Sequence, residues 1–347
     1  MFHSRVARWI TVMSTVLLFQ TVALAQAVNN AQIHGLVQDP TGAIVVGAKV
    51  TATQTETGRI QVAKSGANGA FELPGLPVGA YSLEVSAPSF KKFLQTGIVL
   101  QVGQNVEVNI PLSVGDVTQE VHVSADAAMV ETQDTSISEV VDQRRIVDLP
   151  LNGRQVTDLI LQSGGAAQPP NSASRDVTTH DYVNSVAISV SGGQINGNNY
   201  LLDGGDNNDS HSNINMPFPF PDALQEYSVQ TSGISARFGL HPGSVVNVVT
   251  KSGGNHFHGD VFEFLRNGDF NARNYFATSQ DTLHRNQYGG TIGGPVRKDK
   301  IFVFGGYQGT SNRTAPPSTI SYVPTAAVLA GDFSMVDGAG CQSSGKA

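Results

Sequence analysis

Cysteine, tryptophan and charge are all scarce in this sequence. The 347 residues include one cysteine, Cys341, and one tryptophan, Trp9. A single cysteine excludes an intrachain disulfide, so packing or a membrane has to stabilise the fold. Charged residues make up 14% of the chain, which is low for a soluble domain, while 40% of the residues are apolar, which is too many for a disordered chain.

Further absences narrow the function classes. The net charge of −7 is spread along the chain and Lys and Arg form no long run, which argues against a nucleic-acid partner. The sequence has no His-Glu-x-x-His motif and no Ser/His/Asp or Cys/His constellation. We therefore expect no catalytic residues, no enzyme activity and no cofactor.

The N-terminus has the pattern of a secretory signal peptide. Arg5 and Arg8 precede an apolar run, and Ala23 and Ala25 fit the small-x-small rule for cleavage. We expect residues 1–25 to be the signal peptide and the mature chain to cross the inner membrane. A permanent anchor is the alternative, which the polar residues within this short run disfavour.

Residues 26–113 are predicted to form an all-β domain. Tyr81, Leu83 and Val85 alternate with polar residues, which is the period of a half-buried strand. Turn-forming stretches such as "DPTG" and "GANG" separate such segments. Their spacing predicts a sandwich of about seven strands.

This domain resembles a known family. The segments "GLVQDPTGAIVVGAKVTATQTETG" and "ANGAFELPGLPVGAYSLEVSAPSF" are similar to the carboxypeptidase regulatory-like domain, a transthyretin-like sandwich of the starch-binding-like group. The resemblance implies no peptidase activity, because the zinc ligands of a peptidase are missing. Sugar binding is an open alternative, and stacking would then use Tyr81, Phe71, Phe90 or Phe93.

Residues 114–255 combine strands with short helices. Asp142 is placed to cap a helix that ends before Pro150, and a second helix fits residues 154–165. The apolar run over residues 245–249 predicts a strand that is buried on both faces.

The same region resembles the plug domain of TonB-dependent outer-membrane receptors. The similar segments are "VSGGQINGNNYLLDGGDNND", "LQEYSVQTSGISARFG" and "SVVNVVTKSGG". Gly192 and Gly193 stand where the family usually has "RG", which indicates the Oar-like branch, whose members also carry the N-terminal sandwich. The resemblance implies an α+β plug.

Residues 256–347 have the pattern of membrane-spanning strands. "QYGGTIGGPV" and "IFVFGGYQGTS" are each about 10 residues long, the length of a tilted strand that crosses a bilayer. The charged "RKDK" between them is the predicted turn, and inward-facing glycines would let the wall approach a plug closely. Residues expected at an aromatic girdle or near lipid are Tyr288, Tyr307, Phe302, Phe304, Phe257, Val261, Phe262 and Phe264. A hairpin of a soluble sheet is the alternative.

The predicted architecture is therefore mainly β. A sandwich is followed by an α+β plug and by the first strands of an outer-membrane β-barrel. Residues 256–347 have room for about four strands, whereas closed bacterial barrels have at least 8. We expect an incomplete barrel and a truncated, N-terminal portion of a receptor.

The resemblance implies uptake of an extracellular nutrient through a plugged barrel in the cell outer membrane, in contact with outer-membrane lipid. A TonB-type energy-transducing protein is the expected periplasmic partner. An alternating segment between sandwich and plug suits strand addition to that partner, although a plain linker strand is equally compatible. This segment consists of Val117, Thr118, Gln119, Glu120, Val121, His122 and Val123.

The ligand, an oligosaccharide or a peptide, is expected at a polar plug loop. Its candidate residues are Asp203, Asp206, Asn207, Asn208 and Asp209. Calcium favours such oxygens, but the spacing departs from the EF-hand loop. Zinc at His256 and His258 lacks a third ligand, so no metal site is predicted. The alternative function is a surface or periplasmic binding module that acts in adhesion without transport.

Overall fold

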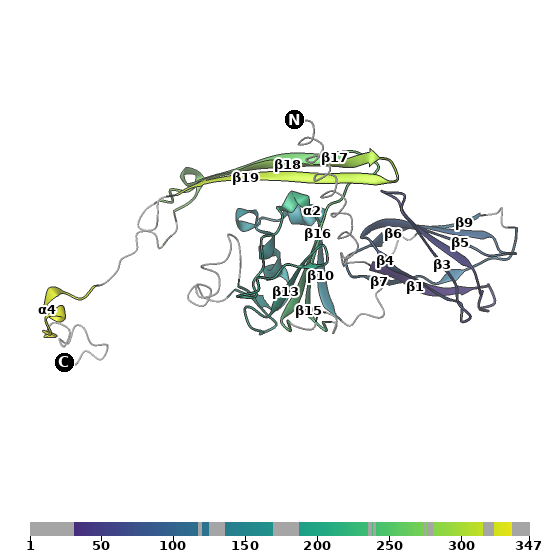
Figure 1. Cartoon of the computed structure of the whole chain (residues 1–347), viewed down its shortest axis with the longest axis horizontal. Helices are drawn as coiled ribbons and strands as arrows, with labels where there is room; N and C mark the ends of the chain where they lie inside the picture. Colours follow the sequence, from purple (N-terminus) through teal and green to yellow (C-terminus); the bar gives the residue numbers. More distant parts are fainter. Residues whose placement is uncertain are drawn as a thin grey trace, which may run out of the picture. The chain divides into compact units, whose positions relative to one another are not determined.

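The fold is described from a computed structural model of the chain (Figure 1). The structure describes residues 31–116, 120–124, 136–168, 187–234, 238, 241–273, 275, 280–314 and 323–334. The predicted signal peptide and Val117, Thr118 and Gln119 lie outside the described residues. Within the described ranges, no helix has the length and apolar content needed to span a membrane. The chain divides into two compact units, Met1–Phe262 with Gly289–Gln308, and Glu263–Tyr288 with Gly309–Ala347.

The first domain is a β-sandwich. One sheet has the order β4-β1-β7, with β8 also paired to β1, and the other has the order β3-β2-β5-β6-β9. The strands are β1 (Ala31–Gln38), β2 (Lys49–Gln54), β3 (Ile60–Lys64), β4 (Ala70–Leu76), β5 (Gly79–Ser86), β6 (Lys92–Leu100), β7 (Asn105–Glu107), β8 (Ile110–Pro111) and β9 (Glu120–Ser124). The predicted sandwich is confirmed, and the short strands β8 and β9 extend it beyond the expected number.

The sandwich core contains the aromatic residues that sugar stacking would use. Alternate residues of β1 and β5 are buried, as the period-two pattern requires. Tyr81, Phe71 and Phe93 are 2–3% exposed, and Phe90 is partly buried against the same core. The Tyr81 hydroxyl donates to the Pro77 carbonyl oxygen at 2.9 Å. Tyr81, Phe71 and Phe93 therefore serve as packing between the two sheets, which leaves them unavailable to the alternative of sugar stacking.

The second domain, for which we keep the name plug from the resemblance in its sequence, contains a five-stranded sheet of order β10-β15-β16-β13-β14. β16 pairs antiparallel with β15 and parallel with β13, and most of its residues are buried, as its apolar run predicts. The sheet strands are β10 (Ile137–Asp142), β13 (Asn198–Leu202), β14 (Gly205–Asp206), β15 (Leu224–Ser232) and β16 (Ser244–Thr250), and a separate pair is formed by β11 (Ala166–Ala167) and β12 (Ser189–Val190).

Short helical turns cover this sheet. Helix α2 (Gln143–Asp148) is capped by Asp142, whose carboxylate accepts from the Arg145 N–H at 2.9 Å, and it ends before Pro150 as predicted. The expected second α-helix is instead a 3₁₀ turn, η3 (Val156–Gln162). Positive φ angles at Gly153 and Arg154 delay its start. Two more turns of this domain are η2 (Asn152–Arg154) and η4 (Pro221–Ala223), whereas η6 (Gly268–Phe270) and α4 (Ala326–Leu329) follow later in the chain, after β17 and after β19.

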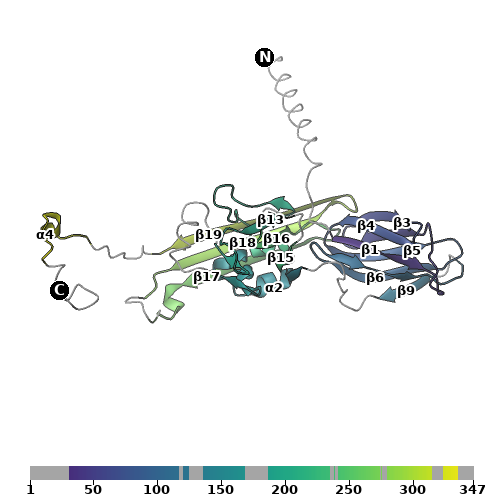
Figure 2. The same cartoon turned by 90° about the horizontal axis from the view of Figure 1, so that it is seen from below.

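A three-stranded sheet of order β17-β18-β19 follows (Figures 1 and 2). Its strands are β17 (His258–Asn267), β18 (His284–Arg297) and β19 (Ile301–Arg313). β18 and β19 are joined at residues 298–300, where the Lys300 N–H donates to the Arg297 carbonyl oxygen at 3.1 Å. The predicted charged turn is confirmed. We call this three-stranded sheet the wall.

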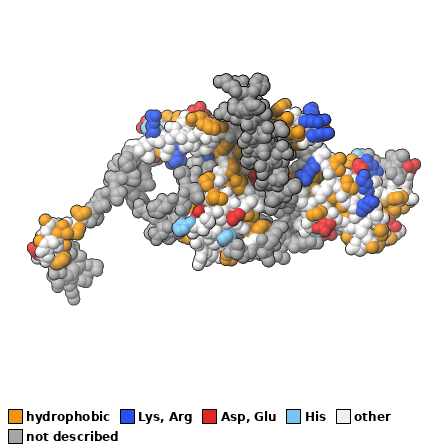
Figure 3. Space-filling view, in the orientation of Figure 1, with side chains coloured by type: hydrophobic (Ala, Val, Ile, Leu, Met, Phe, Trp, Pro, Cys, Tyr) orange, Lys and Arg blue, Asp and Glu red, His pale blue; other side chains and the backbone are white. Residues whose placement is uncertain are grey.

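Side chains of the wall alternate between two faces. Val261, Ile292 and Val303 are 91%, 68% and 56% exposed. Neighbouring positions turn inward, because Thr291 is 8% exposed and the ring of Phe304 stacks on that of His258. Figure 3 shows apolar side chains on the surface along the upper rim, where Figure 1 draws the wall.

The face of three predicted lipid-facing residues has to be corrected. Phe302 and Phe304 are half-buried, whereas Ile301 and Val303 beside them are more than half exposed. Phe262 is also half-buried and packs on Phe220 of the plug. Phe262 and Phe304 belong to the inner face because they meet aromatic, cationic or histidine partners there, and Phe302 shares the face of Phe304 by the alternation of the strand. Other residues expected near lipid or at a girdle are exposed, namely Phe257, Val261, Phe264, Tyr288 and Tyr307.

Candidate functional site

The candidate site is the contact between the plug sheet and the inner face of the wall. Its centre is Arg154, which the positive φ of Gly153 and of Arg154 itself turns away from the helical segments on either side. The Arg154 guanidinium forms an ion pair with Asp222 at the start of η4. Their side chains are 11% and 7% exposed, so both charges are largely removed from water.

An aromatic side chain of the wall completes this centre. The Arg154 guanidinium carbon lies 4.4 Å from the ring centroid of Phe262, a distance that permits cation–π attraction. The same ring meets Phe220, with centroids 5.6 Å apart and planes tilted by 51°. Phe262 of β17 is therefore held by a cation and by a ring of the plug.

A second charged contact lies beside the first. The Lys251 ammonium is 3.5 Å from an Asp260 carboxylate oxygen, and the Lys251 side chain is 7% exposed. Burial lowers the pKa of Arg154, while Asp222 and, more weakly, Asp260 oppose that shift. Because an arginine stays protonated even so, the centre holds two cations between two carboxylates.

The wall approaches the plug closely at one glycine. A Cβ added at Gly306 would lie 2.8 Å from the Phe220 ring. Any larger residue at this position would have to displace that ring. The prediction that inward-facing glycines allow a close approach is confirmed here.

A buried carboxylate lies on the side of the plug that faces the sandwich. Glu226 of β15 is 7% exposed, and its Oε2 atom accepts from the Val102 N–H at 2.8 Å. Burial raises the pKa of Glu226 to about 7; the Val102 N–H opposes the shift and the charge of Asp142 adds to it. This contact therefore changes its charge near neutral pH.

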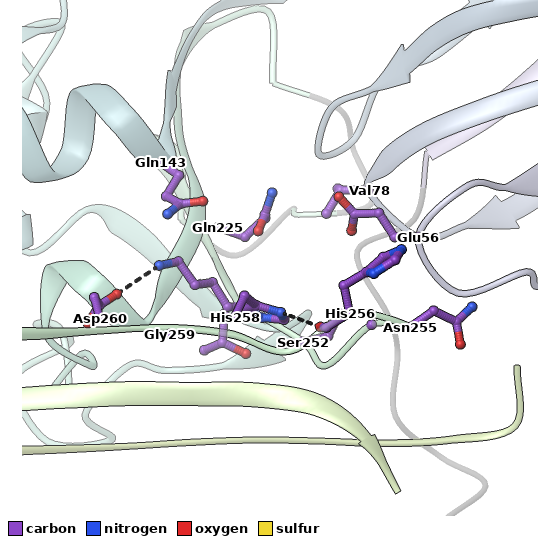
Figure 4. A pocket seen from close by; sticks show the side chains of 13 residues that line it. Glu56, Val78, Gln143, Gln225, Ser252, Asn255, His256, His258, Gly259 and Asp260 are labelled. Carbon is purple, nitrogen blue, oxygen red and sulfur yellow. Dashed lines mark hydrogen bonds and ion pairs between the residues drawn. The ribbon is translucent and has the colours of Figure 1, made fainter. Parts of the chain in front are cut away.

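A polar cavity of about 510 Å³ is bordered by Glu56 of the sandwich, by Gln143 and by the segment that leads into β17. Figure 4 shows Glu56 and His256 on one side and Gln143 and Asp260 on the other. Among the described residues no group of three His, Cys, Asp or Glu side chains is arranged for a metal ion. The cavity suits a polar ligand or solvent.

The predicted ligand-loop residues lie together after β13. Asp203 accepts from the N–H and the hydroxyl of Thr250, each at 2.8 Å, and Asp206 accepts from the Asn208 N–H at 3.0 Å. The Asn208 side chain in turn accepts from the Tyr200 N–H at 2.9 Å. These side chains therefore tie the loop to β13 and β16.

The other two candidates fold the turn that follows. Asn207 is 7% exposed and donates to the Met216 carbonyl oxygen at 3.0 Å. Asp209 accepts from the hydroxyl and the N–H of Ser212, each at 2.6 Å, and the hydroxyl bond lowers the Asp209 pKa most. All five polar residues thus have partners within the plug, and their binding of a ligand stays a prediction.

The described part of the predicted partner segment lies on the sandwich. Residues 120–124 form β9, which pairs in parallel with β6 at the edge of the five-stranded sheet. Val121 is half-buried, and His122 and Val123 are exposed. The segment is a strand, as its alternation predicts, but the sandwich rather than the plug provides its neighbour.

Sequence reasoning missed the residues at the centre of the site. Arg154 and Asp222 are 68 positions apart, and no periodic pattern links residues at that separation. The one available signal was a lone arginine beside a glycine in "LPLNGRQV". Glu226 and Lys251 gave no signal, because each is a single charge, Glu226 within β15 and Lys251 directly after β16.

Comparisons with known proteins agree with this architecture. Residues 32–113 match the carboxypeptidase regulatory-like domain family, and residues 249–345 match the outer membrane beta barrel domain family. The chain is 26% identical over 318 residues to the TonB-dependent transporter Oar of Myxococcus xanthus. The chain resembles a TonB-dependent outer-membrane receptor of the Oar type. The match covers 88% of this chain and 29% of the Oar transporter's length.

Solved structures give more distant likenesses to this Oar-like chain. The siderophore receptor PirA of Acinetobacter baumannii is 19% identical, with 51% of this chain and 24% of PirA covered at a TM-score of 0.38. Hydroxyquinol 1,2-dioxygenase of Pseudomonas putida is 13% identical, with 27% of this chain and 59% of the enzyme covered at a TM-score of 0.22. At these TM-scores neither likeness assigns an activity to the Oar-like chain.

Proposed function

We propose that this chain forms the sandwich, the plug and the first wall strands of an outer-membrane receptor that admits an extracellular nutrient. In this proposal the plug closes the barrel until a TonB-type partner in the periplasm pulls on the segment that contains β9. The two-faced wall is the observation that carries the proposal. Its outer side chains are apolar and exposed, as contact with lipid requires, and its inner side chains contact the plug.

The way in which the plug is held supports a gating role. Within the described residues the plug sheet and the wall are separate sheets, so no backbone ladder joins them. Their contacts are made by side chains, chiefly Arg154 on Phe262 and Lys251 on Asp260. Such contacts can be broken one after another while both sheets stay folded. The plug can therefore be moved at a cost of several kcal/mol rather than by global unfolding.

Membrane assembly tests the proposal. The intact gene product should be found in the outer membrane and should shift its mobility on heating, as a folded barrel does. Ile292→Arg places a charge on the outer face of the wall, where about 2–4 kcal/mol opposes insertion near the midplane. Val62→Arg, at an exposed valine of the sandwich, is the matched control. The proposal predicts less assembled protein for Ile292→Arg alone.

A soluble periplasmic protein, or equal assembly of both arginine variants, would contradict a lipid-facing wall. The partner segment has its own test, which is binding of the periplasmic part of the TonB-type protein to the Val121→Pro variant. Proline removes a backbone N–H, so binding by strand addition should weaken. Unchanged binding would show that the partner does not use this segment.

A further inference from the structure

Backbone hydrogen bonds hold the chain that leaves the sandwich beside the residues that precede β6. The Lys91 N–H donates to the Ser113 carbonyl oxygen at 2.8 Å, and the Gly115 N–H donates to the Ser89 carbonyl oxygen at 3.1 Å. Phe90 and Val114 form an isolated antiparallel bridge between these bonds. Residues 113–115 are thus held beside the start of β6.

Residues 120–124, which form β9, lie alongside β6 itself. β9 pairs with it in parallel over five positions, from Lys92 opposite Glu120 to Thr96 opposite Ser124. Both stretches therefore bind the same side of the sandwich. One backbone edge of β9 is occupied by β6, and the other carries no strand among the described residues. A partner that pairs with the edge facing β6 would have to displace β6.

The side chains of β9 are also partly inaccessible to a partner. Val121 lies opposite Phe93, which is 3% exposed in the sandwich core, and Val121 itself is half-buried. A partner that reads alternate side chains of the segment needs Val121 as well as Val123. Docking on β6 therefore hides part of the recognition surface.

The pairing is weak enough to be reversible. β9 has five residues, lies at the edge of the sheet and pairs in parallel, which is slightly less stable per residue than antiparallel pairing. Its removal would leave β5 and β2 paired as before, because β6 separates them from β9. The sandwich can therefore stay folded when β9 leaves.

We propose that the sandwich is a reversible clamp on the partner segment, so that β6 and the TonB-type partner compete for residues 120–124. The inference rests on the proposed function, since it assumes that this partner binds the segment. It gives the sandwich a regulatory role without a ligand of its own. If β9 is released about one tenth of the time, the whole chain binds the partner about tenfold more weakly than the free segment does.

A disulfide that fixes β9 on β6 tests the clamp. Leu94 and His122 are opposite each other in the register, and neighbouring strands are about 4.8 Å apart, within the range that a disulfide spans. Leu94→Cys with His122→Cys, in a Cys341→Ser background, forms the locking pair. The matched control uses the same position on β6, with Leu94→Cys and Glu84→Cys, and links β6 to β5.

Binding of the periplasmic part of the TonB-type protein is then measured to each oxidised and reduced chain, and to a free peptide of residues 116–124. We expect at least tenfold weaker binding for the oxidised locking pair than for its reduced form, and no change in the control pair. The free peptide should bind more tightly than the unmodified chain.

Equal binding by the oxidised and reduced locking pair would overturn the clamp while leaving the partner segment in place. Failure of the disulfide to form would overturn it too, because β9 would then not lie on β6 in solution. If neither the peptide nor any reduced chain binds, the partner segment is wrong, and the clamp is overturned with it.

Discussion

Breaking the Arg154–Asp222 pair should destabilise the plug far more than breaking an exposed pair. Both side chains are at most 11% exposed, so Asp222→Ala leaves a buried guanidinium without this carboxylate. Loss of one member of a buried pair costs about 3–5 kcal/mol. Arg154→Met should cost about as much, because it leaves the Asp222 carboxylate buried and also removes the cation–π contact with Phe262, worth about 1 kcal/mol.

A variant that lacks both charges shows how much of the cost of each single variant comes from leaving one charge buried without its partner. The double variant Arg154→Met with Asp222→Leu removes both buried charges, so its cost should stay within about 2 kcal/mol of the native chain. Hydrogen exchange of the β15 and β16 amides reports the free energy of opening of the plug. The control is Arg144→Ala, which breaks the exposed pair with Asp148 and should leave exchange unchanged. Single variants that cost under about 1 kcal/mol, or a double variant that costs the sum of the two, would contradict the burial of both charges as a coupled pair.

Three further predictions concern the plug and its borders. The pKa of Glu226 is about 7 in the folded chain, against an ordinary value of 4.5, so between these pH values the folded state holds a proton that the unfolded state releases. The stabilising contribution of this protonated carboxyl is complete below pH 4.5 and is lost as pH rises through 7. Glu226→Gln should therefore unfold like the native chain at pH 4 and be more stable by up to about 3 kcal/mol at pH 8 in urea titrations, and equal stability at pH 8 would contradict this. Gly306→Val should displace the Phe220 ring and speed exchange of the η4 amides, whereas unchanged exchange would deny the close approach. Asp203→Ala should release the loop from Thr250, seen as faster exchange of residues 205–215 with β15 unaffected; equal protection of the loop would show that the carboxylate does not anchor it.

Local patterns predicted the elements that depend on neighbouring residues. The alternation in β5, the Asp142 cap, the buried strand β16 and the charged turn at 298–300 are each determined within a few positions of the chain. Backbone geometry at such sites follows from side-chain period and capping alone. These predictions were therefore confirmed.

The face of β19 could not be predicted in the same way. "IFVF" is apolar at four successive positions, so a period of two does not choose between its faces. The choice is made by long-range partners, since Phe304 stacks on His258 and leaves Val303 exposed. Arg154 and Glu226 were missed for a related reason, because burial of a single charge depends on what the rest of the fold places around it.

The docking of β9 shows the same limit. Alternation predicted a strand over residues 117–123, of which the structure describes 120–123, but a strand pattern does not determine which strand pairs with it. The parallel pairing with β6 joins residues of the sandwich to the chain that follows it.

Single-cysteine spin labels along the wall, in outer membranes and in a Cys341→Ser background, show which face of the wall meets lipid. Collision rates with oxygen, which concentrates in lipid, and with a water-soluble nickel complex give the environment of each position. We predict high collision rates with oxygen at Val261, Ile292 and Val303, and low rates with both reagents at Phe262, Thr291 and Phe304. Access of the nickel complex to all six positions, without alternation, would contradict a wall that faces lipid on one side and a plug on the other.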